Sequence, residues 1–117
     1  MQRFPMLAAL ALLAGCGSNP GEPLVAADLA GIAQEPRFER CMAQIMRFHR
    51  LGVWQNGGAR PTVDEAAWEA LSQSEQDEML IAAGCIALGG KPGERIVTIT
   101  ASQYARELAT RRVTIPE

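Results

Sequence analysis

The chain has 117 residues, of which 48% are hydrophobic and 21% are charged. This length and balance fit one globular domain and exclude pervasive disorder and collagen-like repeats. The formal net charge of −2 argues against a nucleic-acid partner, and three cysteines are too few for a disulfide-dense miniprotein.

The first residues form a secretory signal. Arg3 supplies a positive charge, and residues 4–14 are uncharged and mostly apolar. This stretch is too short to span a bilayer, which takes about 20 apolar residues. It ends in Leu13-Ala14-Gly15-Cys16, which resembles the lipobox of bacterial lipoproteins.

The lipobox resemblance implies how the chain is processed. The signal peptide, residues 1–15, would be removed, and Cys16 would become an N-terminus that carries covalent lipid. Several acyl chains on one residue give stable membrane anchoring. Gly17 stands where an Asp would hold an enteric lipoprotein in the inner membrane, so the outer membrane is favoured. We therefore expect an envelope protein that faces the periplasm, with the lipid on Cys16 and no other cofactor.

The mature chain divides into a tether and a domain. Residues 16–23 are expected to form the lipidated N-terminus and a flexible tether, because Gly, Pro and small polar residues build no core. Residues 24–117 are expected to form a single small helical domain. Its first segment, residues 24–34, has apolar residues at helical spacing and predicts a short helix, although Gly31 weakens it.

A clear helical period runs from Pro36 to Arg50, and Gly52 is a plausible stop. One side of this predicted helix is basic and carries Arg37, Arg40, Arg47 and Arg50. The other side is apolar and carries Phe38, Cys41, Met42, Ile45, Met46, Phe48 and His49. The basic side either lies against the acidic region 64–78, faces a partner, or is simply solvated. A loop over residues 53–61 is expected next.

Two capping boxes predict the starts of the next two helices, at Thr62–Glu65 and at Ser72–Glu75. The second helix includes ten consecutive uncharged residues, 79–88, which are apolar all round the helix. A helix that is apolar on every side is buried on every side, so we expect it at the centre of the core.

The C-terminal part is expected to be mixed. The short β-branched run Arg95–Thr100 predicts a strand, residues 102–111 predict a helix with Tyr104 and Leu108 facing inward, and Val113–Ile115 predicts a second small strand. The expected fold class is therefore mainly α: a small bundle of three to four short helices with a minor β element near the C-terminus.

Cys41 and Cys85 are the thiols left once Cys16 is acylated. An oxidising compartment favours a disulfide between them, and the alternative is two separate buried thiols. The bridge would contribute roughly 4 kcal/mol in the chain-entropy model.

Met42, Met46 and His49 share one flank at spacings of four and three residues. Thioether and imidazole groups of this kind could hold cuprous copper. The simpler interpretation is that the methionines fill the core and that His49 is a buried, hydrogen-bonded core histidine. We therefore expect no metal site, with these three residues as the alternative.

Catalysis has little support in the sequence. His49 is the one histidine, and there is no Cys-x-x-Cys, phosphate-binding loop or nucleophile elbow. Trp54, beside the Gly-rich loop, is either an exposed aromatic anchor for a partner or a lid over the bundle.

The function expected from these observations is a non-catalytic one: a small membrane-anchored lipoprotein that binds a periplasmic or envelope protein or has a structural role. The alternative is periplasmic copper binding through Met42, Met46 and His49. A further alternative is an exclusion lipoprotein of a conjugative element, which only size and anchoring suggest.

Overall fold

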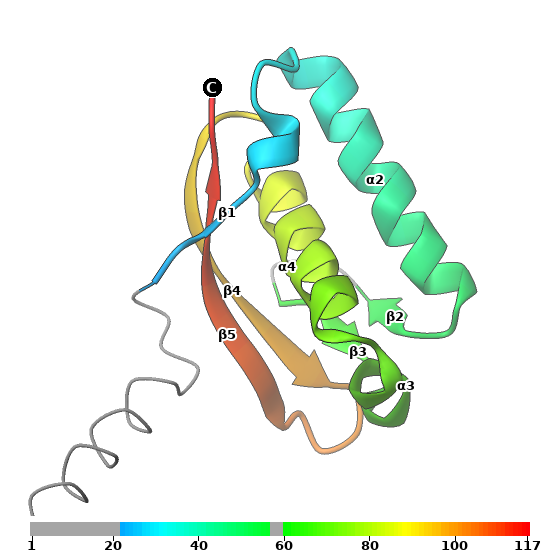
Figure 1. The fold of residues 1–117 in the computed structure, drawn as a ribbon. Coiled ribbons are helices and arrows are strands. Elements are labelled where there is room, and N and C mark those ends of the chain that lie inside the picture. The colour runs from blue at the N-terminus through cyan, green and yellow to red at the C-terminus, as the bar shows by residue number, and fades with distance from the viewer. Residues whose placement is uncertain (1–21, 57–59) are drawn as a thin grey trace, which may run out of the picture.

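The computed structural model describes residues 22–56 and 60–117 and has two layers, with the helices covering one face of a β-sheet (Figure 1). The elements in chain order are β1 (Leu24–Val25), the 3-10 helix η1 (Ala27–Leu29), α2 (Gln34–Arg50), β2 (Trp54–Asn56), β3 (Thr62–Val63), α3 (Glu65–Ala70), α4 (Gln73–Ala87), β4 (Gly93–Ala101) and β5 (Glu107–Ile115).

The expectation of a mainly α bundle is wrong. The described residues are 44% helical and 27% strand, and the strands form one five-stranded mixed sheet, which makes this an α/β fold. The strand order is β1-β5-β4-β3-β2. The long β4–β5 hairpin is antiparallel, and β1 and β3 join its outer edges as parallel neighbours, with β2 antiparallel to β3.

The central position of α4 is confirmed, but the expectation that it is buried on every side is not, since Ile81 and Ile86 are half-buried and Ala87 is exposed. This helix lies across β4 and β5 with α2 beside it (Figure 1), and Met79, Leu80 and Cys85 are almost completely buried. Gly84 allows the close approach to the sheet, because a Cβ atom there would meet Cγ1 of Val113 at 2.8 Å. A small residue is therefore required where α4 crosses β5.

Local capping signals fixed one helix start correctly and misplaced another. Ser72 and Glu75 form the expected capping box, with Glu75 N donating to Ser72 Oγ at 3.1 Å and Ser72 N to Glu75 Oε1 at 2.9 Å. The hydrogen bond from the Ser72 backbone, followed by that with its side chain, lowers the pKa of the Glu75 carboxyl. Thr62, by contrast, lies in β3, and α3 is capped by Asp64, whose carboxylate accepts from Ala67 N at 2.9 Å.

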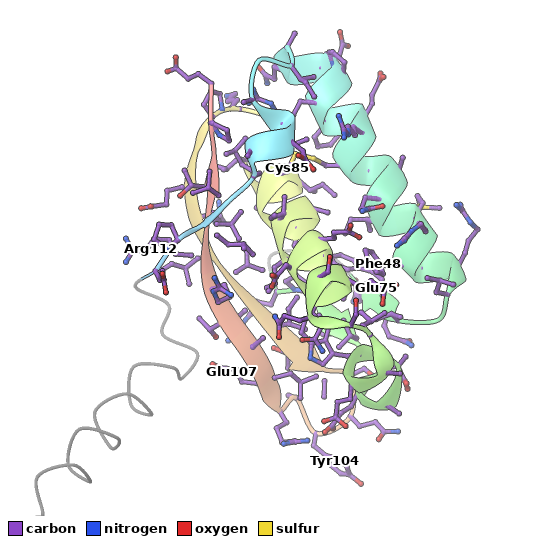
Figure 2. All side chains as sticks on the ribbon, in the orientation of Figure 1. Phe48, Glu75, Cys85, Tyr104, Glu107 and Arg112 are labelled. Atoms are coloured by element: carbon purple, nitrogen blue, oxygen red, sulfur yellow. A yellow bond between two sulfur atoms is a disulfide. The ribbon has the colours of Figure 1, made fainter. Side chains whose placement is uncertain are left out.

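Two expected helices are absent from the described chain. Residues 24–34 form β1 and η1, because the backbone pairs with β5 and Gly31 turns at a φ of +80°. Residues 102–106 form a turn and residues 107–111 form the first half of β5, which pairs with β4. Tyr104 and Ala105 take positive φ values in that turn, and Tyr104 is 95% exposed at the hairpin end and does not face inward (Figure 2).

Candidate functional site

A cleft of about 620 Å³ opens between α2 and the segment Val25–Leu29. The α2 wall runs from Arg40 to Arg50, and Ile81 and Ala82 of α4 form the floor. The cleft exists because β1 joins the edge of the sheet and η1 then crosses over α4, facing α2 (Figure 1).

The orientation of α2 is set by its buried side. Cys41, Ile45 and Phe48 are at most 5% exposed and pack into the core. These residues recur every three or four positions, so they fix the rotation of the helix about its axis. Arg40, Arg47 and Arg50 are consequently carried to the cleft wall, and the basic face expected from the sequence is present there.

The three cleft arginines differ in their partners. Arg47 forms an ion pair with Glu78 of α4 at 3.7 Å, and Gln44 Nε2 donates to the same carboxylate at 3.4 Å. Arg40 and Arg50 are exposed and make no ion pair or hydrogen bond with side chains in residues 22–56 and 60–117. Arg40 and Arg50 are therefore available to bind an anion, and Arg47, which lies between them in the sequence, is neutralised by Glu78.

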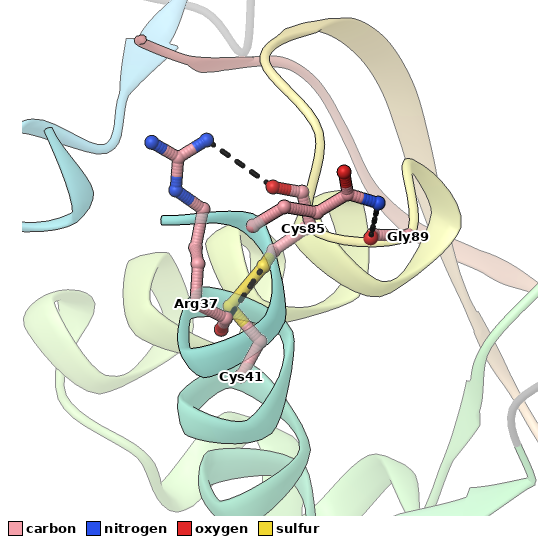
Figure 3. The surroundings of a disulfide bond; sticks show 6 residues. Arg37, Cys41, Cys85 and Gly89 are labelled. Atoms are coloured by element: carbon pink, nitrogen blue, oxygen red, sulfur yellow. Dashed lines mark hydrogen bonds between the residues drawn. A yellow bond between two sulfur atoms is a disulfide. The ribbon is translucent and has the colours of Figure 1, made fainter. Parts of the chain in front are cut away.

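A disulfide between Cys41 and Cys85 joins α2 to α4, with the two Cα atoms 6.3 Å apart (Figure 3). At the same end of the helix pair, Gln34 Nε2 donates to the carbonyl of Gly89 at 3.2 Å. These links tie the N-terminal half of α2, where the α2 wall of the cleft begins, to the end of α4.

Arg37 departs from its expected place on the polar side of the helix, because it is only 2% exposed. Its guanidinium Nη1 donates to the carbonyl of Gly90 at 3.2 Å, just beyond the C-terminus of α4 (Figure 3). Carbonyls at a helix C-terminus carry partial negative charge, so a buried cation is tolerated there. Arg37 therefore supports the helix pair and does not line the cleft.

The expected burial of Met42, Met46 and His49 is wrong. Met42 is 37% exposed, Met46 is 45% exposed, and His49 is also exposed. The buried side of α2 is displaced from the side that the sequence pattern indicates, because it includes Arg37. Met42, Met46 and His49 are therefore left exposed. None of the three side chains lines the cleft, and the His49 imidazole has no hydrogen bond or ion pair among the described residues.

Trp54 is half-buried in β2 and packs against the core. This position agrees better with a lid than with an exposed anchor. The sequence did not indicate that Val25–Leu29 forms a cleft wall, because its apolar spacing predicted a short helix. No local signal marks it, since its place depends on pairing with a strand near the other end of the chain.

No family model, curated protein or solved structure matches this chain. The lipobox with Cys16 and most of the tether lie outside the described residues. In the described part of the chain, no helix has the length and hydropathy of a membrane span. Nor does that part contain a group of three His, Cys, Asp or Glu side chains arranged to hold a metal ion.

Proposed function

We propose that this protein is a small envelope lipoprotein with a non-catalytic role, anchored through lipid on Cys16. It binds another envelope protein through the cleft between α2 and the segment Val25–Leu29. The motif Leu13-Ala14-Gly15-Cys16 supports the anchor, and Gly17 supports the outer membrane with the domain facing the periplasm. An exclusion lipoprotein of a conjugative element would be one special case of this role.

The binding role rests on one observation: the cleft carries two arginines without partners in the described chain, Arg40 and Arg50. Surface cations are commonly solvated, but two of them beside a recess whose floor includes apolar side chains support a recognition role. A non-catalytic role is supported by the thiols, because Cys41 and Cys85 are bridged and offer no nucleophile. His49 also lies outside the cleft.

Photo-crosslinking in living cells tests the binding role. The crosslinking amino acid p-benzoylphenylalanine replaces Gln44, which lines the cleft, or Gln103, an exposed control in the β4–β5 turn. We expect an adduct of one mass from position 44 and none from position 103. Ala43→Phe fills the cleft from an exposed helix position, so it should abolish the adduct. An adduct that survives Ala43→Phe, or that also forms from position 103, would refute binding in the cleft.

The anchor has its own test. A Cys16→Ser variant should lose incorporation of labelled palmitate and leave the membrane fraction, because the thiol that carries the lipid is gone. The Cys41→Ala variant serves as the control and should keep both properties. Absence of label from the wild-type protein would show that no lipid is attached.

Periplasmic copper binding is the second candidate function, and the exposure of Met42, Met46 and His49 favours it. Positions separated by four and three residues lie on successive turns of one helix face. Two thioethers and an imidazole with no other partner form a soft ligand set for cuprous ion.

Thermal unfolding with copper kept cuprous by ascorbate, which leaves the Cys41–Cys85 bridge closed, tests the copper candidate, because a ligand that binds only the folded state raises the melting temperature. Copper(I) should raise it in the wild type and leave it unchanged in Met42→Leu and in His49→Gln. Leu51→Ala, which changes an exposed residue just beyond α2, is the control and should keep the response. An unchanged melting temperature in the wild type would eliminate this candidate.

A further inference from the structure

We infer that the occupant of the cleft is an extended, acidic peptide segment of the partner protein, with two carboxylates held by Arg40 and Arg50. This inference rests on the proposed function and adds the chemistry and conformation of what is bound. It follows from the spacing between Arg40 and Arg50, from the apolar side chains between them, and from the two carboxylates that also line the cleft.

The spacing of the arginines suits an extended chain. Arg40 and Arg50 are ten positions apart on α2, which is about 15 Å along the helix axis. A strand-like peptide advances about 3.3 Å per residue, so it covers this distance in four to five residues. Each guanidinium has a planar set of donors that matches a carboxylate in two parallel hydrogen bonds. Two acidic side chains four or five residues apart would therefore meet both arginines.

The floor between the arginines suits small apolar side chains. Ile81 is half-buried and Ala82 is buried, and Val25 in the opposite wall is 52% exposed. An exposed valine beside an apolar floor gains stabilisation when it is covered, by about 25 cal/mol for each Å² of apolar surface removed from water. The residues between the two acidic positions are consequently expected to be small and apolar.

Two carboxylates that line the cleft disfavour a dense polyanion. Asp28 of η1 and Glu78 of α4 both line the cleft, and Glu78 already neutralises Arg47. Clustered phosphates of a lipid headgroup would be repelled by these two carboxylates. A peptide separates its charges and can place them at the two ends, away from the Glu78–Arg47 pair. The charge pattern therefore favours a peptide over an anionic membrane surface.

A labelled peptide tests this inference on the full-length protein purified in detergent. The probe is a fluorescein-labelled hexapeptide with glutamate at both ends and alanine and valine between them. Fluorescence anisotropy should report binding that weakens as salt is added, because the contacts are ionic. Arg40→Glu and Arg50→Glu should each weaken it by about tenfold or more. Arg95→Glu is the matched control, since it makes the same charge change on an exposed part of β4.

Three outcomes would overturn the inference. The first is equal binding of a peptide with glutamine at both ends. The second is equal affinity of the Arg40→Glu and Arg95→Glu variants. The third is displacement of the probe by phosphatidylglycerol vesicles and not by unlabelled peptide, which would assign the arginines to an anionic lipid surface.

The crosslink from position 44 separates this inference from the proposed function. If the adduct forms and is lost in the Arg40→Glu, Arg50→Glu double variant, the acidic partner is supported. If the adduct persists in that variant, the protein binds a partner through other contacts and the acidic segment is refuted. If no adduct forms in the wild type, the proposed binding role itself fails.

Discussion

Opening the Cys41–Cys85 disulfide should remove a large share of the stability of the domain. The two cysteines are 44 residues apart, and the bridge restricts the unfolded chain over that whole loop. The loop-closure relation gives an entropy of roughly 13 cal/mol/K, which is about 4 kcal/mol at 25 °C. Small domains have a total unfolding free energy of about 5–15 kcal/mol, so the bridge accounts for a quarter or more of it.

Urea unfolding of the full-length protein, with and without a phosphine reductant, measures this contribution. Reduction keeps both sulfur atoms in the core, so it isolates the effect of the covalent link. We expect a loss of about 4 kcal/mol and a fall in melting temperature of about 15 °C or more. The dependence of the unfolding free energy on urea should also steepen, because a reduced unfolded chain exposes more surface.

A Cys41→Ala, Cys85→Ala double variant supplies the control. The reductant should not change its stability, and it should be less stable than the reduced wild type, because both side chains are buried and their removal leaves a cavity. If the reductant lowers the stability of the double variant as much as that of the wild type, its effect is not on this bridge. Two thiols that react freely with an alkylating agent in native protein from the envelope would refute the bridge itself.

Further predictions follow from packing, capping and ionisation. Gly84→Ala should destabilise the protein by about 1–3 kcal/mol in urea unfolding despite its better helix propensity, because its Cβ meets Val113 at under 3 Å; unchanged stability would show that α4 can move off the sheet. Phe48→Ala should cost about 3–5 kcal/mol in the same assay, since Phe48 is fully buried, and a cost below 1 kcal/mol would contradict that burial. Ser72→Ala should raise the lowered pKa of Glu75 only part of the way back to 4.5, as measured by carbon-13 NMR titration, because the side-chain contribution of Ser72 is lost while the larger one, the hydrogen bond from the backbone N–H of residue 72, remains; an unchanged pKa would disprove the side-chain half of the capping box. Because the pKa of Glu75 is lower in the folded protein, its contribution to stability should be present above about pH 4.5 and lost as the pH falls through the folded-state value; the difference in unfolding free energy between the wild type and the Ser72→Ala variant should therefore be largest above about pH 4.5 and shrink in acid.

The parts of the fold that depend on short-range signals were predictable. The helix over residues 36–50 follows from its period, and the burial of α4 follows from ten uncharged residues in succession. The capping box at Ser72 works between neighbours three positions apart, so it survives in any tertiary context.

The sheet was not predictable in the same way, because its strands are defined by distant partners. Thr62 and Val63 resemble a helix start, yet they pair with Thr100 and Ala101. Residues 102–111 contain good helix formers, but the pairing of β5 with β4 overrides that preference.

The candidate site likewise combines one wall that short-range signals predict and one wall that depends on distant pairing. The basic wall follows from the arginines on one side of a predicted helix, and it lies where that helix faces outward. The opposite wall depends on the parallel pairing of Leu24 with Val113 near the other end of the chain, which no local pattern encodes. The exposure of His49 also could not be read from the helical period, because a buried Arg37 displaces the centre of the buried arc.

The disulfide also determines how a pulling force at the N-terminal end would travel through the protein. The two-residue strand β1 is held to β5 at the edge of the sheet, so it is the contact that yields first. Extension then stops at Cys41, because the covalent bridge passes the load directly to Cys85 and the loop between them bears no tension. The cleft straddles this boundary: the part of its α2 wall beyond Cys41 is shielded, whereas Arg40 and the Val25–Leu29 wall lie in the extensible segment. Tension on a lipid anchor would therefore open the cleft from one side and release its occupant while the bridged part of the helix pair stays folded.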